Sequence, residues 1–250
     1  MSALKLVSLD AAVQQTPPRD WLIESVIERG SFFGIIGPAE AGKTFVAVDL
    51  ASAVASGTQW LGMPANGSGK VVYLSSEASH SVVRRLAGWQ VYHGVKTGAN
   101  IFVPSVTAAL TENSDLVLDE LEQADPDLLI VDTWARATPG MNENSAEQVS
   151  ETIRRLDILR SRTGCAIGIV HHVTASTGKA RGSTALNAAF DTEFTITPGA
   201  EPGVGSLRQS KVKDGVRSVN NSLNFHIVSA PADPSGDTVG VIVPTTTGGY

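Results

Sequence analysis

Short runs of apolar residues alternate with longer stretches of mixed polarity over the first two-thirds of the chain. The apolar runs lie at 31–36, 70–75, 127–132 and 166–170, and a shorter one lies at 100–103. Runs that are apolar at nearly every position are typical of strands buried on both faces of a parallel sheet. The pattern therefore predicts several such strands, distributed along the first 170 residues.

Helical patterns separate these predicted strands. An Ala-rich segment follows the first run and ends at Ser56-Gly57, and further helical segments are predicted at 79–92, 116–122 and 146–162. Strands that alternate with helices of this length are typical of βαβ units. The first two-thirds of the chain is therefore predicted to form an α/β fold around a parallel sheet.

The two ends of the chain follow different patterns. Residues 1–25 contain Pro17-Pro18 and show no sustained period, which predicts an N-terminal arm ahead of one domain over residues 26–250. From about Phe190, short strands separated by turn signals at 198–199, 214–215 and 234–236 predict an antiparallel extension. The expected fold class is α/β, with a mainly parallel sheet and a C-terminal antiparallel extension.

The composition limits the class of protein, its compartment and its partners. Apolar residues make up 42% of the 250 residues, which is enough for a core without disulfides or metal. The single cysteine, Cys165, adjoins an apolar run and favours a reducing compartment. No apolar stretch reaches the length of a membrane span, so we expect a cytoplasmic protein with no membrane association. The net charge of −6 argues against nucleic-acid binding by bulk charge, but leaves local basic residues able to contact DNA.

One motif carries specific chemistry. The residues from Gly37 to Thr44 match G-x-x-x-x-G-K-[ST], between a predicted strand and a predicted helix. In this context successive backbone N–H groups surround phosphates, while the lysine contacts the β- and γ-phosphates and the hydroxyl binds Mg²⁺. The predicted cofactors are ATP and Mg²⁺, with Lys43 catalytic and Thr44 on the metal. The predicted nucleotide-binding residues are Gly37, Pro38, Ala39, Glu40, Ala41, Gly42, Lys43, Thr44 and Phe45.

Two acids complete the predicted ATP site. Asp132 ends a buried strand, where open α/β sheets bind ligands, and is predicted to hold Mg²⁺, with a helix N-cap or an ion pair as the alternative. The next residue is Thr133, so an acid that polarises the attacking water must come from elsewhere. Glu77 follows the strand at 70–75 and is the predicted catalytic carboxylate, with an acid in the first turn of a helix as the alternative.

Together these features resemble the RecA-like ATPases, and most closely the hexameric replicative helicases of plasmids of the RepA type. The resemblance covers residues of about 20 to 230 and rests on Leu-Ser-Ser-Glu at 74–77, Val-Asp-Thr at 131–133, and His171-His172 ahead of Arg-Gly-Ser at 181–183. It implies a three-layer P-loop fold and a homo-oligomer, either a hexameric ring or a filament.

The resemblance also implies roles for polar residues beyond the phosphate loop. His172, with His171 as the alternative, corresponds to a sensor of the γ-phosphate at the tip of a core strand. The segments 134–146 and 173–183 correspond to DNA-binding loops, and Lys179 and Arg181 would contact single-stranded DNA. For the second loop, a solvated polar loop is the alternative interpretation.

A basic pair near the C-terminus resembles the finger motif of ring helicases and recombinases. Lys211 and Lys213 are two apart on a predicted strand, so both are expected to point to one face. The resemblance implies that they enter the ATP site of a neighbouring subunit and act on the γ-phosphate. The alternative is a charged hairpin face ahead of an Asp-Gly turn.

The preferred function is an oligomeric, Mg·ATP-dependent ATPase acting on single-stranded DNA, with a replicative DNA helicase ahead of a recombinase. The alternatives are a recombination mediator and an ATP-gated assembly or regulatory module that moves no DNA. A small-molecule kinase shares the phosphate loop, but the sequence shows no Arg-rich lid, and Glu77 fits the activation of water better.

Overall fold

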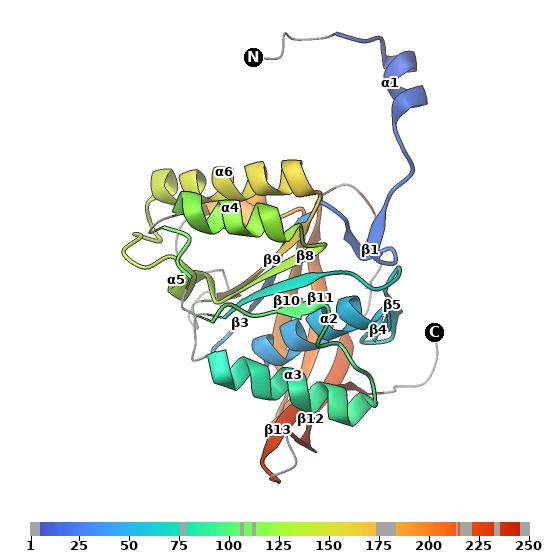
Figure 1. The fold of residues 1–250 in the computed structure, drawn as a ribbon, viewed down its shortest axis with the longest axis vertical. Coiled ribbons are helices and arrows are strands. Elements are labelled where there is room, and N and C mark those ends of the chain that lie inside the picture. The colour runs from blue at the N-terminus through green and yellow to red at the C-terminus, as the bar shows by residue number, and fades with distance from the viewer. Residues whose placement is uncertain are drawn as a thin grey trace.

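A nine-stranded sheet forms the centre of the protein (Figure 1). The computed structural model describes residues 6–75, 79–105, 108–111, 114–173, 184–213, 215, 222–232 and 236–245, and all counts refer to these. In spatial order the strands are β13 (Thr238–Pro244), β12 (Leu223–Pro231), β11 (Val204–Val212), β10 (Thr192–Pro198), β3 (Phe32–Gly37), β9 (Ala166–His172), β8 (Leu128–Asp132), β6 (Val71–Ser75) and β7 (Ile101–Phe102).

The sheet is parallel from β10 to β7 and antiparallel from β11 to β13. This arrangement confirms the predicted fold class. The antiparallel part begins one strand later than the pattern after Phe190 suggests, because β10 pairs in parallel with β3. A strand's own residues predict that it is a strand, but its direction depends on the partner beside it.

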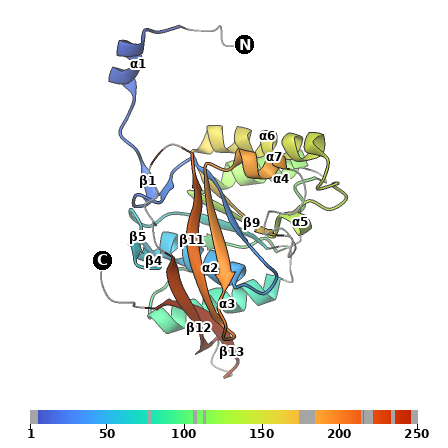
Figure 2. The same cartoon turned by 180° about the vertical axis from the view of Figure 1, so that it is seen from behind.

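Helices cover both faces of the sheet (Figures 1 and 2). One face carries α2 (Lys43–Ser56) and α3 (Ser79–His93), and the other carries α4 (Ser114–Ala124), α5 (Trp134–Ala137), α6 (Ala146–Thr163) and α7 (Thr184–Ala189). Alternate residues of β3 enter the two apolar clusters, with Phe33 and Ile35 in one and Phe32 and Ile36 in the other. The result is the predicted three-layer fold. Among the described helices, none combines the length and apolarity that a bilayer span requires.

The N-terminal segment joins the core earlier than residue 26. Helix α1 (Leu9–Gln15) buries no residue and stands apart from the sheet (Figures 1 and 2). Strand β1 (Trp21–Ile23) pairs with β2 (Ile27–Glu28), and Leu22 and Ile23 belong to the core. A second small hairpin joins β4 (Gln59–Trp60) to β5 (Met63–Pro64). The division into an arm and a domain stays a prediction, but packing against the domain starts before its predicted boundary.

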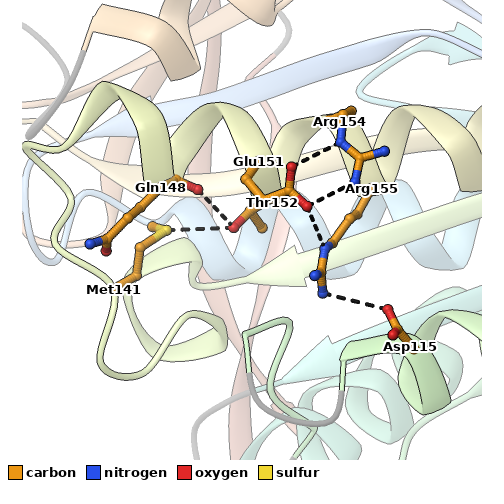
Figure 3. A network of polar contacts seen from close by, with 7 residues as sticks. All are labelled: Asp115, Met141, Gln148, Glu151, Thr152, Arg154 and Arg155. Atoms are coloured by element: carbon orange, nitrogen blue, oxygen red, sulfur yellow. Dashed lines mark hydrogen bonds and ion pairs between the residues drawn. The ribbon is translucent and has the colours of Figure 1, made fainter.

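Ion pairs link the outer surfaces of α6 and α4 (Figure 3). The carboxylate of Glu151 accepts hydrogen bonds from Arg154 and Arg155, and these bonds lower its pKa to about 2. Arg155 also lies 3.6 Å from Asp115 at the start of α4. Exposed ion pairs contribute little to stability. The apolar faces of the two helices, with Leu121 and Leu156 buried beneath them, therefore hold this layer on the sheet.

Candidate nucleotide-binding site

The carboxyl ends of four neighbouring strands bring the predicted ATP-site residues together. Gly37 at the end of β3 is in register with His172 on β9, and Asp132 on β8 is in register with Ser75 on β6. The order of the strands is β3, β9, β8, β6, so these four residues lie along one edge of the sheet. This edge is where open α/β sheets bind their ligands.

Glycine is required at both ends of the phosphate loop. A Cβ on Gly37 would lie 2.8 Å from the backbone oxygen of Ile196, too close for any side chain. Gly42, immediately before α2, has a φ of 91°, a left-handed conformation that favours glycine. These two constraints set the tight turn from β3 into α2, whose N-terminal N–H groups face the loop as an anion site requires.

Lys43 is buried at the first position of α2, with 5% of its surface exposed. Its ammonium donates a hydrogen bond to the carbonyl oxygen of Pro38 within the loop. Burial lowers the pKa of Lys43 to about 8, and the nearby charge of Asp132 opposes that shift. A desolvated cation at the end of a loop of N–H groups suits a phosphate anion, because the anion restores the charge interactions that burial removed.

Asp132 is also buried, with 4% of its surface exposed. Its Oδ2 accepts a hydrogen bond of 2.7 Å from the hydroxyl of Tyr73 on the neighbouring strand β6. Thr44 lies next to Lys43 in the first turn of α2. A carboxylate held in place by Tyr73 and a hydroxyl on the phosphate-binding helix are oxygen donors of the kind that Mg²⁺ prefers. The residues present therefore fit the predicted Mg·ATP.

Of the other residues predicted at this edge, only some belong to the part of the chain that the structure describes. Glu77 lies two positions beyond Ser75 and outside the described residues, as do Lys179 and Arg181 in the segment 174–183. At the end of β9, the N–H of Val173 donates to the carbonyl oxygen of Gly37 at 3.1 Å. His171 is 1% exposed, and His172 is half-buried beside Gly37. His172 is thus the more accessible of the two predicted sensors.

Trp134 begins the first of the two predicted DNA-binding loops, the segment 134–146, but it is a core residue. It starts the short helix α5 and is 1% exposed within the cluster beneath α6. Its ring is therefore not available to stack on a base.

Lys211 and Lys213 lie at the opposite edge of the sheet from the phosphate loop. Val212 is in register with Thr192, and Thr192 is in register with Phe33 near the start of β3. Phe33 is four residues before Gly37, about 13 Å along β3 at about 3.3 Å per residue, and β11 lies two strands away from β3, which adds about 10 Å sideways. A lysine side chain is much shorter than this distance. A nucleotide on the phosphate loop of the same chain therefore lies beyond the reach of these lysines.

A groove of about 490 Å³ beside the start of α2 was not anticipated from the sequence. Phe45 and three α3 residues (Ser81, Arg84 and Arg85) line one side, and residues 237–240 around the start of β13 line the other. The guanidinium of Arg85 lies 4.7 Å from the ring centroid of Phe45. Only a long-range contact between α3 and the C-terminal extension creates this groove, so no local pattern signals it.

A buried acid lies on α2 behind the phosphate loop. Asp49 is 4% exposed and accepts a hydrogen bond of 2.7 Å from Trp89 Nε1 on α3, whose ring stacks on His93. Burial raises the pKa of Asp49 to about 7, although the hydrogen bond from Trp89 and a weaker one from the backbone of Leu61 oppose the shift. Asp49 therefore changes charge near neutral pH.

The stability of the protein should consequently depend on Asp49 and pH. The unfolded carboxyl loses its proton near its ordinary pKa of 3.8, whereas the folded one keeps it up to about 7. The folded state thus binds more protons in between, and the free energy of unfolding falls as pH rises through this range. Asp49→Asn should remove that fall and raise Tm at pH 8 by several degrees.

Thermal unfolding from pH 4 to pH 8 checks this expectation, with Asp119→Asn, an exposed acid on α4, as the matched control. The two variants should behave alike at pH 4. A wild-type Tm profile that Asp49→Asn leaves unchanged would show that Asp49 is ionised at no cost to folding.

Comparisons with known proteins agree with this geometry. A family model described as an AAA domain matches residues 1–178. A crystal structure described as that of the RadB recombinase is similar, with a TM-score of 0.57 and 16% sequence identity, over 80% of this chain and 88% of that chain. At this level of identity the structural likeness shows a shared RecA-like fold.

Proposed function

The chain belongs to the AAA domain family, and on this premise we propose that it is an oligomeric Mg·ATP-dependent ATPase acting on single-stranded DNA. The RecA-like fold and the phosphate loop support an ATPase of this kind. The observation that carries the proposal is the gathering of buried Lys43 and Asp132 with half-buried His172 at one sheet edge, around the Gly37–Thr44 loop.

Each residue at the edge has a proposed part in hydrolysis. The loop N–H groups and Lys43 would hold the β- and γ-phosphates, while Thr44 and Asp132 would hold Mg²⁺. Bound Mg²⁺ neutralises charge on the phosphate oxygens. Glu77 would accept a proton from the attacking water, and His172 would contact the γ-phosphate. The groove beside Phe45 adjoins the loop, and we expect it to receive the nucleoside.

The position of the basic pair supports an oligomer. Lys211 and Lys213 lie at the far edge from their own phosphate loop, so they would act on ATP held by a neighbouring copy. A contact of this kind joins opposite edges of successive copies, which generates a ring or a filament. We favour a ring and a replicative-type DNA helicase, because the motifs resemble those of hexameric plasmid helicases.

A second candidate is a recombination-related ATPase without helicase activity. The structural likeness to the RadB recombinase supports it. Strand displacement separates the two: a helicase should release the shorter strand of a forked duplex when ATP is added, whereas a recombination mediator should bind the single strand without releasing it.

Binding to single-stranded DNA tests the proposal most directly. The double variant Lys179→Ala with Arg181→Ala should bind single-stranded DNA more weakly in the presence of ATP and lose stimulation of hydrolysis. The slope of log affinity against log salt should decrease by about 1.4 per protomer, because two phosphate contacts at about 0.7 each are removed. Fluorescence anisotropy of a labelled oligonucleotide at several salt concentrations measures both quantities.

The matched control is Lys96→Ala with Arg208→Ala, which removes the same charge from two exposed residues elsewhere. It should leave the salt slope unchanged. If the wild-type protein with ATP binds no single-stranded DNA even at low salt, DNA is not its substrate, and the ATP-gated assembly alternative takes its place.

A further inference from the structure

The two lysines of the predicted finger motif do different things in the structure. Lys211 lies near the end of β11 and Lys213 directly after it, close to a point where the pairing of β11 with β10 is irregular. Phe194 is opposite Gln209, and the next residue back on β10, Glu193, is opposite Lys211. Ser210 is therefore an extra residue on β11, a β-bulge. Its hydroxyl bonds to the carboxylate of Glu193 at 2.6 Å, which holds the bulge in place.

The bulge decides which face of the sheet Lys211 occupies. Side chains alternate along a strand, so without the bulge Lys211 would lie on the same face as Gln209, which is 2% exposed. The extra residue shifts the alternation by one position. Lys211 therefore shares the face of its partner Glu193, and this is the face on which α7 lies.

Lys211 caps the end of α7. Its ammonium donates to the backbone oxygen of Asn187 at 2.8 Å and to that of Ala188 at 3.2 Å, at the last turn of α7. The final carbonyls of a helix have no partner within the helix and carry partial negative charge, so a lysine there is favourable. The last turn of α7 and the end of β11 are thereby joined. Helix α7 also begins directly after the segment predicted to bind DNA.

Lys213 is held much less firmly. Its backbone N–H donates to the carbonyl oxygen of Asp191 at 2.8 Å, which fixes the base of the side chain. Its ammonium lies 3.5 Å from Asp191 Oδ1, and the side chain is 61% exposed. Asp191 Oδ2 already accepts hydrogen bonds from Arg160 at 2.8 Å and from the N–H of Phe32 at 2.9 Å. An exposed pair of this length, with a carboxylate that has other donors, is easily exchanged for a phosphate.

We propose that Lys211 is a positioning residue that fixes the end of β11 against α7, so that Lys213 alone is presented to the phosphate of a neighbouring copy. This inference rests on the proposed trans action of the finger motif. It gives the two lysines different roles: Lys211 positions the end of the strand, and Lys213 contacts the phosphate. The bulge at Ser210 precedes both lysines and turns both toward the face that carries α6 and α7. Their roles differ because Lys211 is still paired with β10 and reaches the carbonyl groups of α7, whereas Lys213 lies beyond the last paired residue.

A double-mutant cycle on ATP turnover tests the proposal. The full-length oligomer is assayed at saturating Mg·ATP as wild type, Lys211→Ala, Lys213→Ala and the double variant. We expect turnover to fall about 10²-fold for Lys213→Ala and about 10-fold for Lys211→Ala. If Lys211 acts through Lys213, the double variant should lose no more than Lys213→Ala alone. Arg208→Ala, on the same strand and exposed, is the matched control and should retain wild-type turnover.

Each other result overturns the inference in a distinct way. A double variant that loses about 10³-fold would mean that the two lysines act independently, as two phosphate contacts or as one phosphate contact and a general stabiliser. Wild-type turnover for Lys211→Ala would show that the cap does not position Lys213. A loss for Lys211→Ala with none for Lys213→Ala would exclude action through Lys213 and would also contradict the trans finger itself. Tm, recorded for all variants, separates unfolding from loss of turnover.

Discussion

Lys43→Ala should reduce ATP hydrolysis by at least about 10²-fold and severely weaken the binding of Mg·ATP. Lys43 is the buried cation of the phosphate loop, with a pKa lowered to about 8 by burial, and it has the one ammonium that the loop itself supplies. Alanine keeps α2 intact but leaves the charge of the bound phosphates uncompensated. Phosphate release measures turnover, and a fluorescent ATP analogue measures binding.

Lys96→Ala, which removes an exposed lysine far from the loop in sequence, is the control for the loss of one positive charge. A similar Tm for the two variants would show that folding is retained. Turnover of Lys43→Ala within a few-fold of the wild-type rate would mean that the loop does not bind the transferred phosphate.

The second large effect concerns sites shared between copies. Glu77→Gln and Lys213→Ala should each lower turnover by about 10²-fold, for different reasons: the first removes the carboxylate that activates water, and the second removes the charge supplied by the neighbour. In a mixed oligomer, some interfaces combine the intact Glu77 of one copy with the intact Lys213 of the next. At equal amounts these are roughly a quarter of all interfaces, so activity should partly return on mixing.

A mixture of Glu77→Gln with Lys43→Ala is the matched control. Both changes lie on the same side of an interface, so no interface in that mixture has an intact site with both residues. No activity should return. If the mixture of Glu77→Gln with Lys213→Ala is also as inactive as its components, the finger motif does not act in trans. In that case Lys213 does not act on the phosphate of a neighbouring copy, and the inference that Lys211 positions it for that contact loses its premise.

The sequence predicted the strand, turn and helix around the phosphate loop because their signals are local. A run of apolar residues followed by Gly37 to Thr44 indicates a buried strand, a tight turn and a helix, and β3 and α2 have this form. Asp132 was predicted from its place at the end of a buried strand, and His172 from the resemblance to RecA-like ATPases; the parallel strands β8 and β9 bring both to one edge. The roles of Glu77, Lys179 and Arg181 stay predictions that experiment must test.

Features that depend on partners distant in sequence were not predicted. The direction of β10, the groove between Phe45 and residues 237–240, and the burial of Asp49 against Trp89 all arise from such contacts. The short strands β1, β2, β4 and β5 hold two or three residues each, too few for a periodic signal.

The basic pair at the end of β11 shows most clearly which features the sequence determined and which depended on the tertiary structure. The sequence by itself determined that Lys211 and Lys213 are two apart near the end of a strand, and this spacing predicted that both would reach one target. Only the tertiary structure decided which face of the sheet they share and what each contacts there, because a bulge at Ser210 changes the alternation ahead of both lysines without leaving a mark in the apolar pattern. Register is a property of two strands together, so the residues of one strand cannot specify it alone. On that face Lys211 contacts carbonyl groups of α7, while Lys213, beyond the last paired residue, stays on the surface.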